Sequence, residues 1–224
     1  MKFIDPYVLV PEIDRELILK KLERRGRLCY KSEDMIGDGS AGPFIERIMG
    51  RNHASVIEHI KLGVIAVTDR GVTHEWVRHR VDSNYSQEST RYCNYGNDRF
   101  GNELTFIKPH DLNEAQFKAM EYGLKAAEVS YFNMLALGCA PQQARRVLPN
   151  QLKTEIAASH GLREWAESVF PLRCGVGAHP DIQRLMIPTL LYFKDCLPEI
   201  FEKVPYNKDF PKEKYAAIVV DNLL

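Results

Sequence analysis

The chain has 224 residues, which is enough for one domain with a sizeable buried core. Hydrophobic residues make up 45% and charged residues 27% of it, as in an ordinary globular protein. Lysine plus arginine equals aspartate plus glutamate at 30 each, so no overall basic field would attract a long nucleic acid.

Hydrophobic periodicity and turn residues predict an α+β domain with few strands and one dominant helix. The expected helices, in chain order, cover residues 17–25, 44–49, 72–80, 113–137, 141–147, 163–170 and 182–201, the last interrupted at Pro188. The expected strands cover 60–67, 103–107 and 151–159, with a β-prone tail at 215–220 and a loop at 37–43. We find no internal repeat or linker, and therefore expect residues 1–224 to form a single domain with a small mixed or antiparallel sheet.

Cysteine usage and the absence of long apolar runs limit the cellular setting. Five cysteines are scattered without any CxxC pair, which argues against a disulfide scaffold and a structural zinc site. No apolar run approaches ~18 residues, and the amino terminus does not look like a signal peptide. We expect a reduced cytoplasmic protein without a membrane segment.

The segment from Arg78 to Tyr92 contains three arginines, a histidine and several hydroxyl side chains. Arginine at this density, beside small polar residues that can present backbone N–H groups, suits a bound phosphate or pyrophosphate. A charged helix end running into a solvated loop is the alternative. Further arginines in apolar surroundings, at 145–149 and 172–174, favour the anionic ligand, since a buried arginine needs a partner.

Three other motifs carry weaker signals. Residues 37–42 match GxGxxG, but they lack the preceding hydrophobic strand and the following long helix of a dinucleotide site. His74 and His79 stand five residues apart, which separates them by roughly 140° around a helix, so we expect no metal site. Ser55 and Glu58 could form a capping box at a helix start or contact a ligand there.

Taken together, five ordered segments resemble the flavin-dependent thymidylate synthases. That family's signature is Arg-His-Arg, seven residues, then Ser, followed shortly by Arg-Tyr, and residues 78–80 with 89–92 are similar to it. Supporting similarities lie at 53–59, 144–149, 161–165 and 172–174, so the resemblance covers roughly residues 50 to 200.

The resemblance implies reductive methylation of dUMP to dTMP. Methylenetetrahydrofolate would supply the carbon and NADPH the hydride, through FAD, in a homotetramer whose active sites are shared between subunits. It implies Arg173 as the catalytic cation, because negative charge developing on the uracil ring needs a fixed positive group and the family uses no enzyme cysteine.

The resemblance also assigns binding residues. For dUMP they are Glu75, Arg78, Gln87, Ser89, Thr90, Arg91, Arg145 and Arg173. For FAD they are His53, Ser55, Glu58, Arg78, His79, Arg80, Gln87, Gly161 and Arg163.

The chain departs from the family pattern at three places. Eight residues, instead of seven, separate Arg80 from Ser89, which places an insertion near 82–84. The segment 161–173 is one residue longer than usual and begins with Gly161 where Asn is common. Gln87 stands where Glu is frequent.

Two other functions compete with the enzyme. The arginine–tyrosine loop 91–95 could stack bases in a nucleotide- or RNA-binding module, although the neutral net charge speaks against it. An inactive scaffold that retains flavin is the third hypothesis, and the insertion after Arg80 is its only support.

Overall fold

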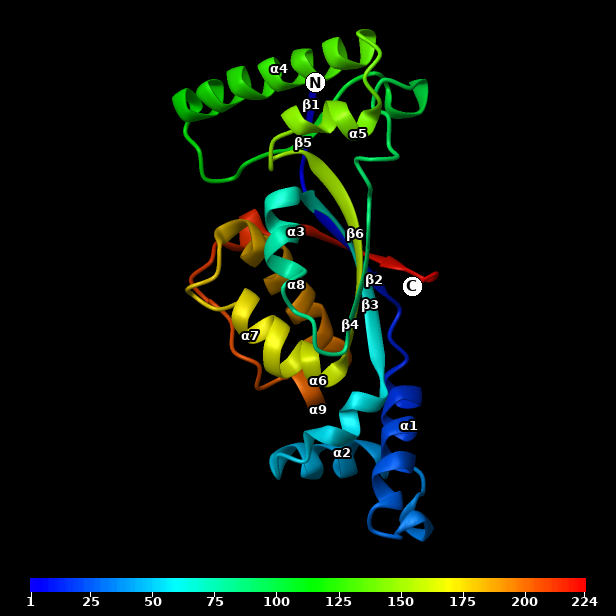
Figure 1. The fold of residues 1–224 in the computed structure, drawn as a ribbon. Helices are drawn as coiled ribbons and strands as arrows, with labels where there is room; N and C mark the ends of the chain where they lie inside the picture. Colours follow the sequence, from blue (N-terminus) through cyan, green and yellow to red (C-terminus); the bar gives the residue numbers. More distant parts are fainter. The chain divides into compact units, whose positions relative to one another are not determined.

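The computed structural model describes residues 1–224 as a mixed α/β fold (Figure 1). Its main sheet has five strands in the order β4-β6-β3-β2-β7, and β1 and β5 form a second sheet. The strands are β1 (Lys2–Ile4), β2 (Tyr7–Pro11), β3 (Lys61–Asp69), β4 (Ser83–Gln87), β5 (Thr105–Ile107), β6 (Lys153–Gly161) and β7 (Ala217–Asp221). No helix combines the length and the apolar character that crossing a membrane requires.

Nine α-helices accompany the strands. They are α1 (Arg15–Leu28), α2 (Ala41–Gly50), α3 (Arg70–Trp76), α4 (Glu114–Ala136), α5 (Pro141–Ala144), α6 (Leu162–Glu164), α7 (Phe170–Arg173), α8 (Pro180–Cys196) and α9 (Pro198–Phe201). Short 3₁₀ turns occur at Glu33–Met35, Ala54–His59, Asp98–Phe100, Arg145–Val147 and Lys212–Lys214, and Trp165–Val169 form a π-helical turn.

The residues divide into two compact units, each built from three separate segments. Unit 1 contains residues 1–7, 66–78 and 86–156, and unit 2 contains residues 8–65, 79–85 and 157–224. The strands β2, β3, β4 and β6 each contribute residues to both units. Because the units interleave along the chain, no linker in the sequence marks them.

Unit 1 is organised around the long helix α4, beside which α5 lies (Figure 1). Asn113 caps α4, with its side chain accepting from Gln116 N at 3.0 Å while Gln116 Oε1 accepts from Asn113 N at 2.9 Å. This capping box explains why the helix begins where it does. Leu124 and Tyr131 of α4 pack with Phe106 in the core of this unit, so the predicted helix and its inner face are confirmed.

β1 and β5 pair in parallel, with Phe3 opposite Phe106. The sequence prediction contained the 103–107 strand but not β1. The amino-terminal strand was missed because its three residues are too few to show periodicity.

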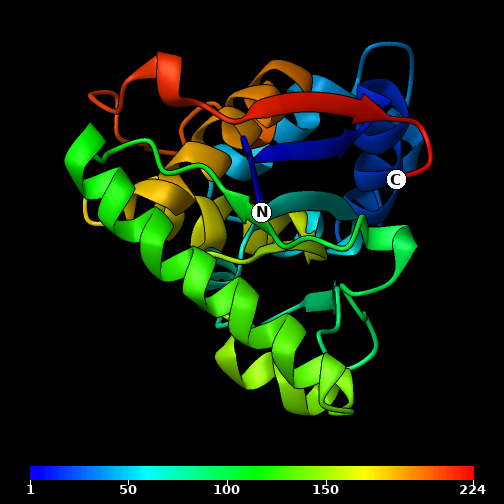
Figure 2. The ribbon, with the colours of Figure 1, turned by 90° about the horizontal axis from the view of Figure 1, so that it is seen from above.

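In unit 2 an aromatic cluster forms the core between α8 and the segment 162–173. The rings of Trp165 and Phe170 stack at 4.8 Å, and Phe193 meets both edge-on. Figure 2 shows β7 and β2 side by side at one edge of the main sheet, as the strand order requires. The predicted β-prone tail is therefore a strand.

The predicted interruption at Pro188 is wrong, since α8 continues through it to Cys196. Proline lacks the N–H that would bond the carbonyl of Arg184 four residues earlier. In this fold the Arg184 carbonyl accepts from Ala216 N at 2.9 Å instead, so the lost bond is replaced. The last helical residue is Cys196, and the C-cap Leu197, the residue before Pro198, has an extended φ, as the restriction on residues preceding proline favours.

Several further predictions need correction. α2 begins at Ala41, so the predicted loop 37–43 is shorter than expected. No strand is predicted at β4, because its sequence, Ser-Asn-Tyr-Ser-Gln, lacks β-branched residues; it is an outer strand of the sheet. Ser55 does not cap a helix: His53 occupies the cap position of the Ala54–His59 turn, without a side-chain bond.

Candidate active site

The predicted catalytic arginine, in unit 2, is the first of four side chains linked by polar contacts: Arg173, His79, Ser168 and Glu164. Arg173 Nε donates to His79 Nε2 at 2.9 Å. His79 Nε2 is therefore the acceptor nitrogen, and Nδ1 carries the proton and lies 3.1 Å from Ser168 Oγ. Glu164 Oε1 lies 3.6 Å from the same Nδ1. The chain runs from a cation to a carboxylate through a neutral imidazole.

Burial keeps His79 neutral. The residue is 6% exposed, and its pKa is lowered to about 4, first by burial and then by the charge of Arg173. The Tyr85 hydroxyl donates to the His79 carbonyl at 2.8 Å, which fixes the backbone as well. Because a protonated imidazole could not accept from Arg173, the neutral form is the one that orients the guanidinium.

His160, which the sequence reading missed, supports this arrangement from β6. It is fully buried, packs edge-on against Trp165 at 4.5 Å, and its Nδ1 lies 2.7 Å from Ser83 Oγ. Its pKa is also lowered to about 4, by burial and then by His79. Glu164 was missed too. Burial raises the pKa of Glu164, against the lowering effect of its bond to Ser168. The sequence signal for this contact is the spacing of four residues between Glu164 and Ser168, which places both on one side of a helix.

A cavity of about 900 Å³ opens in the same unit. Three predicted FAD residues line it, namely Ser55, Glu58 and Arg163, together with Glu164 and Ser168 of the hydrogen-bonded chain. Arg163 holds two carboxylates at 2.6 Å each, those of Glu58 and Glu167. Arg163 therefore borders the cavity as a cation that is paired with the carboxylates of Glu58 and Glu167.

The remaining predicted FAD residues are distributed differently. His53 lines a separate hollow of about 230 Å³ that also contains Arg47 and Arg51, and its Nδ1 lies 3.0 Å from the Tyr30 hydroxyl. Arg80 is exposed. Arg78 and Gln87 belong to unit 1, whereas every other predicted FAD residue belongs to unit 2.

Asp82, in the segment 82–84 near which the insertion is expected, and Gly161 of β6 meet in space. A Cβ atom at Gly161 would overlap the carboxylate of Asp82 and lie 3.1 Å from its Cγ. Asp82 has a positive φ of 47° and pairs with Lys61. Its carboxylate therefore occupies the space into which a larger residue at 161 would extend.

The extra residue between Gly161 and Arg173 is also accounted for. Trp165–Val169 form a π-helical turn, and a π turn holds one residue more than an α turn. Ser168, which reaches His79, belongs to this turn. The longer segment 161–173 therefore contains the turn whose Ser168 contacts His79, the acceptor of the hydrogen bond from the predicted catalytic Arg173.

Unit 1 holds the predicted phosphate residues. Arg145 donates to Thr90 Oγ1 at 3.4 Å, and Ser89 Oγ accepts from Arg91 N at 3.3 Å. Arg91 lies over the Tyr92 ring, 5.4 Å from its centre. Arg91 and Arg145 are exposed. The expectation of a buried Arg145 is therefore wrong, and its charge is available to a ligand.

The other predicted dUMP residues of this unit, Glu75, Arg78 and Gln87, precede the segment Ser89–Arg91 in the sequence. Gln87 Nε2 donates to Thr73 Oγ1 at 2.9 Å and to Thr154 Oγ1 at 3.2 Å. A carboxylate at this position could donate to neither hydroxyl. A carboxylate there could only accept from these hydroxyls, so an amide reverses the direction of the contact. Glu75 lies in α3, half-buried.

Comparison with known proteins decides the family. Residues 18–199 match the family described as "Thymidylate synthase complementing protein", Thy1. The chain belongs to the Thy1 family. The resemblance seen in the sequence is confirmed, and the match extends upstream of the motifs that revealed it.

Relatives of this Thy1 chain include the flavin-dependent thymidylate synthase of Geobacter sulfurreducens, 31% identical over 78% of this chain and 77% of that protein. That of Mycolicibacterium vanbaalenii is 31% identical over 80% and 77%. A crystal structure of a UMP/dUMP methylase from Streptomyces cacaoi, bound with 5-Br dUMP, shares the fold. It has a TM-score of 0.73 at 16% identity and covers 90% of this chain and 95% of that one.

Proposed function

We propose that this protein is a flavin-dependent thymidylate synthase. It methylates dUMP to dTMP, with methylenetetrahydrofolate as carbon donor and NADPH as reductant, using FAD. The observation that carries the proposal is the family match across residues 18–199, which includes every predicted site residue. The nucleotide- or RNA-binding alternative has no comparable support.

Unit 2 has the features that a flavin cofactor needs. Its cavity of about 900 Å³ is within the range of cofactor pockets. Arg163 and Arg25 offer cationic groups to a diphosphate, and Ser55 offers a hydroxyl. FAD, when bound, passes the reducing equivalents of NADPH to the nucleotide. Arg163 Nε and Nη1 donate to Glu167 and Glu58, and its remaining N–H groups are the ones it offers to that diphosphate.

The segment Ser89–Arg91 and Arg145 bind the nucleotide phosphate in this proposal. Their hydroxyl groups and exposed guanidinium groups form a donor set suited to a dianion. Gln87 stands next to this segment, but its amide faces Thr73 and Thr154. We therefore assign it to orienting the segment.

Arg173 stabilises negative charge as it develops on the uracil ring. A guanidinium stays charged and presents a planar set of donors, so a fixed one lowers the energy of an anionic transition state. His79 holds Arg173 Nε, which fixes the plane of the guanidinium. Ser168 and Glu164 in turn hold the imidazole in the tautomer that accepts this bond.

A homotetramer with shared active sites, as proposed, suits the outer face of α4. This face exposes Tyr122 (82%), Val129 (49%) and Leu137 (85%), apolar side chains that contact between subunits would cover. A cytoplasmic location, also proposed, suits five cysteines that are all free.

The test is a coupled assay on the purified protein. We expect NADPH oxidation that depends on dUMP and methylenetetrahydrofolate, with dTMP as product and tritium released from 5-labelled dUMP. A colourless protein that binds nucleotide would support the binding module instead. A yellow protein that bleaches with NADPH but releases no tritium would support the inactive flavin scaffold.

A further inference from the structure

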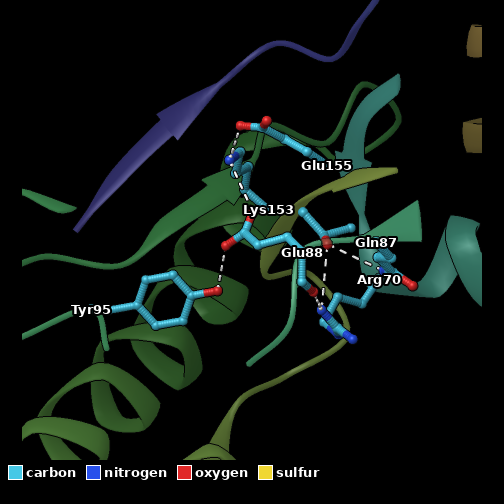
Figure 3. Close-up of polar contacts among 7 residues, drawn as sticks. Arg70, Gln87, Glu88, Tyr95, Lys153 and Glu155 are labelled. Carbon is cyan, nitrogen blue, oxygen red and sulfur yellow. Dashed lines mark hydrogen bonds and ion pairs between the residues drawn. The ribbon is translucent and has the colours of Figure 1, made fainter. Parts of the chain in front are cut away.

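A partly buried ion-pair cluster lies next to the phosphate-binding segment in unit 1 (Figure 3). Its centre is Glu88, the residue between strand β4 and Ser89. The Glu88 side chain is 11% exposed and that of its partner Lys153 is 20% exposed. The sequence motifs of the family do not include either residue, and the proposed mechanism does not use them.

Both oxygens of the Glu88 carboxylate are bonded. Oε1 accepts from the Tyr95 hydroxyl at 2.6 Å, and Oε2 accepts from Lys153 Nζ at 3.1 Å. Lys153 also pairs with Glu155, as Figure 3 shows. Hydrogen bonds to an ionised group in a buried site are among the stronger ones in proteins.

The backbone of Glu88 is held as firmly as its side chain. Its N–H donates to the Glu155 carbonyl at 2.9 Å, and its carbonyl accepts from Arg70 at 3.3 Å. Arg70 donates at the same time to Thr154 Oγ1 at 3.3 Å. Every polar group of Glu88 is therefore bonded to a neighbour.

The Glu88–Tyr95 bond closes a loop. These two residues bracket Ser89–Asn94, so a single hydrogen bond joins the beginning and the end of the segment that carries the predicted phosphate ligands. Tyr95 is itself immobilised: it is 6% exposed, its ring packs 5.8 Å from that of Tyr131, and its N–H lies 3.3 Å from the Tyr131 hydroxyl.

The protonation states suit a permanent bond. Burial, and next the charge of Glu88, raise the pKa of Tyr95, so its hydroxyl remains a donor. The pKa of Lys153 is raised overall, because its bonds to Glu155 and Glu88 outweigh the lowering effect of burial. Tyr95 therefore stays a donor and Lys153 stays charged.

We propose that Glu88 is a positioning residue for phosphate recognition. By joining Tyr95 and Lys153, it holds Ser89, Thr90 and Arg91 in the conformation that receives the nucleotide phosphate. This inference rests on the proposed function and adds to it residues that touch no substrate.

Tyr95→Phe is the sharpest test, since it removes one hydroxyl and keeps the buried ring. Glu88→Gln is the second variant and serves if the first fails to fold. Glu114→Gln, which removes an exposed ion pair with Lys118 in the same unit, is the matched control. The measurements are kcat, KM for dUMP, inhibition by inorganic phosphate, and flavin content per subunit.

In both cluster variants we expect KM for dUMP and the inhibition constant of phosphate to rise together, about 5- to 20-fold. We expect kcat within twofold of the unsubstituted protein, with full flavin content. Glu88→Gln keeps one side-chain oxygen, which can accept from Tyr95 or from Lys153 but not serve both as the carboxylate does, so the double variant should be at least as impaired as either single variant. The control should behave as the unsubstituted protein.

Unchanged phosphate inhibition in both variants would overturn the proposal, as would a fall in kcat and flavin content with KM unaltered. If the unsubstituted protein forms no dTMP, the proposed function fails first. If it forms dTMP and the variants keep normal KM values, only the inference about Glu88 fails.

Discussion

Acidification should destabilise this protein through two buried histidines. His79 and His160 both have a pKa lowered to about 4, for which burial is the first cause, whereas an unfolded histidine titrates near 6.5. Between these values the unfolded chain binds protons that the folded chain does not. The stabilisation is therefore complete above pH 6.5 and is lost as the pH falls towards 4.

The magnitude follows from the same values. Lowering a histidine pKa from 6.5 to about 4 corresponds to about 3 kcal/mol for each residue. Where both residues titrate, the free energy of unfolding should fall by up to about 2.7 kcal/mol per pH unit. Glu164 opposes this slope, because its raised pKa makes the folded state bind a proton more readily.

Urea unfolding between pH 7.5 and 4.5, followed by the fluorescence of buried Trp165, measures the slope. His160→Gln keeps a polar partner for Ser83 but does not titrate, so it should lower the slope by about 1.4 kcal/mol per pH unit. His59→Gln, at an exposed histidine, is the control. An unchanged slope in both His160→Gln and His79→Gln would refute the reasoning.

Three further predictions concern the site directly. Arg173→Ala should lower kcat at least ~100-fold, the range for losing one fixed charge at a developing anion, and near-normal methylation would contradict its role. Gly161→Ala should destabilise the protein by about 1 kcal/mol, because the added methyl group displaces Asp82 from its partly exposed ion pair with Lys61. In an Asp82→Gly background the same Gly161→Ala change should instead stabilise the protein by about 0.5 kcal/mol. Equal effects of Gly161→Ala in the two backgrounds, measured by denaturation, would disprove the contact. Arg163→Ala should raise the dissociation constant of FAD about tenfold. Glu167→Gln, which removes one of the two ion pairs of Arg163, should not raise it. Titration of the apoprotein with FAD measures both constants.

The sequence predicted elements with a strong local signal. Helix α4 was predicted within one residue at each end, because its inner positions repeat at helical spacing and Asn113 caps it. Strand β4 was not predicted, since its polar residues carry no alternation of apolar side chains. Pro188 was misread because the bond that replaces its missing N–H comes from Ala216, which is distant in sequence.

The candidate site likewise has features that the sequence predicted and contacts that it could not predict. Arginine spacing and order along the chain were sufficient to recognise the family and to select Arg173. They could not show that His79 accepts a hydrogen bond from Arg173, since 94 residues separate the two. Nor could they show Glu88 and Lys153 pairing across 65 residues. Contacts of this kind depend on the packed fold, which a single sequence does not display.

The two insertions bear on the inactive-scaffold hypothesis. Random insertion into a decaying site would be expected to leave a loop without defined contacts. Here Asp82 lies against Gly161 and pairs with Lys61, and the extra residue of 161–173 is housed in the π turn that carries Ser168 to His79. A larger residue at 161 could not coexist with Asp82 in its present place, so the glycine and the inserted loop are compatible only together. Asp82 and Gly161 are therefore adjusted to each other, and the Arg173–His79 contact is in place in the same unit, so the longer loop after Arg80 does not by itself indicate a catalytically inert protein.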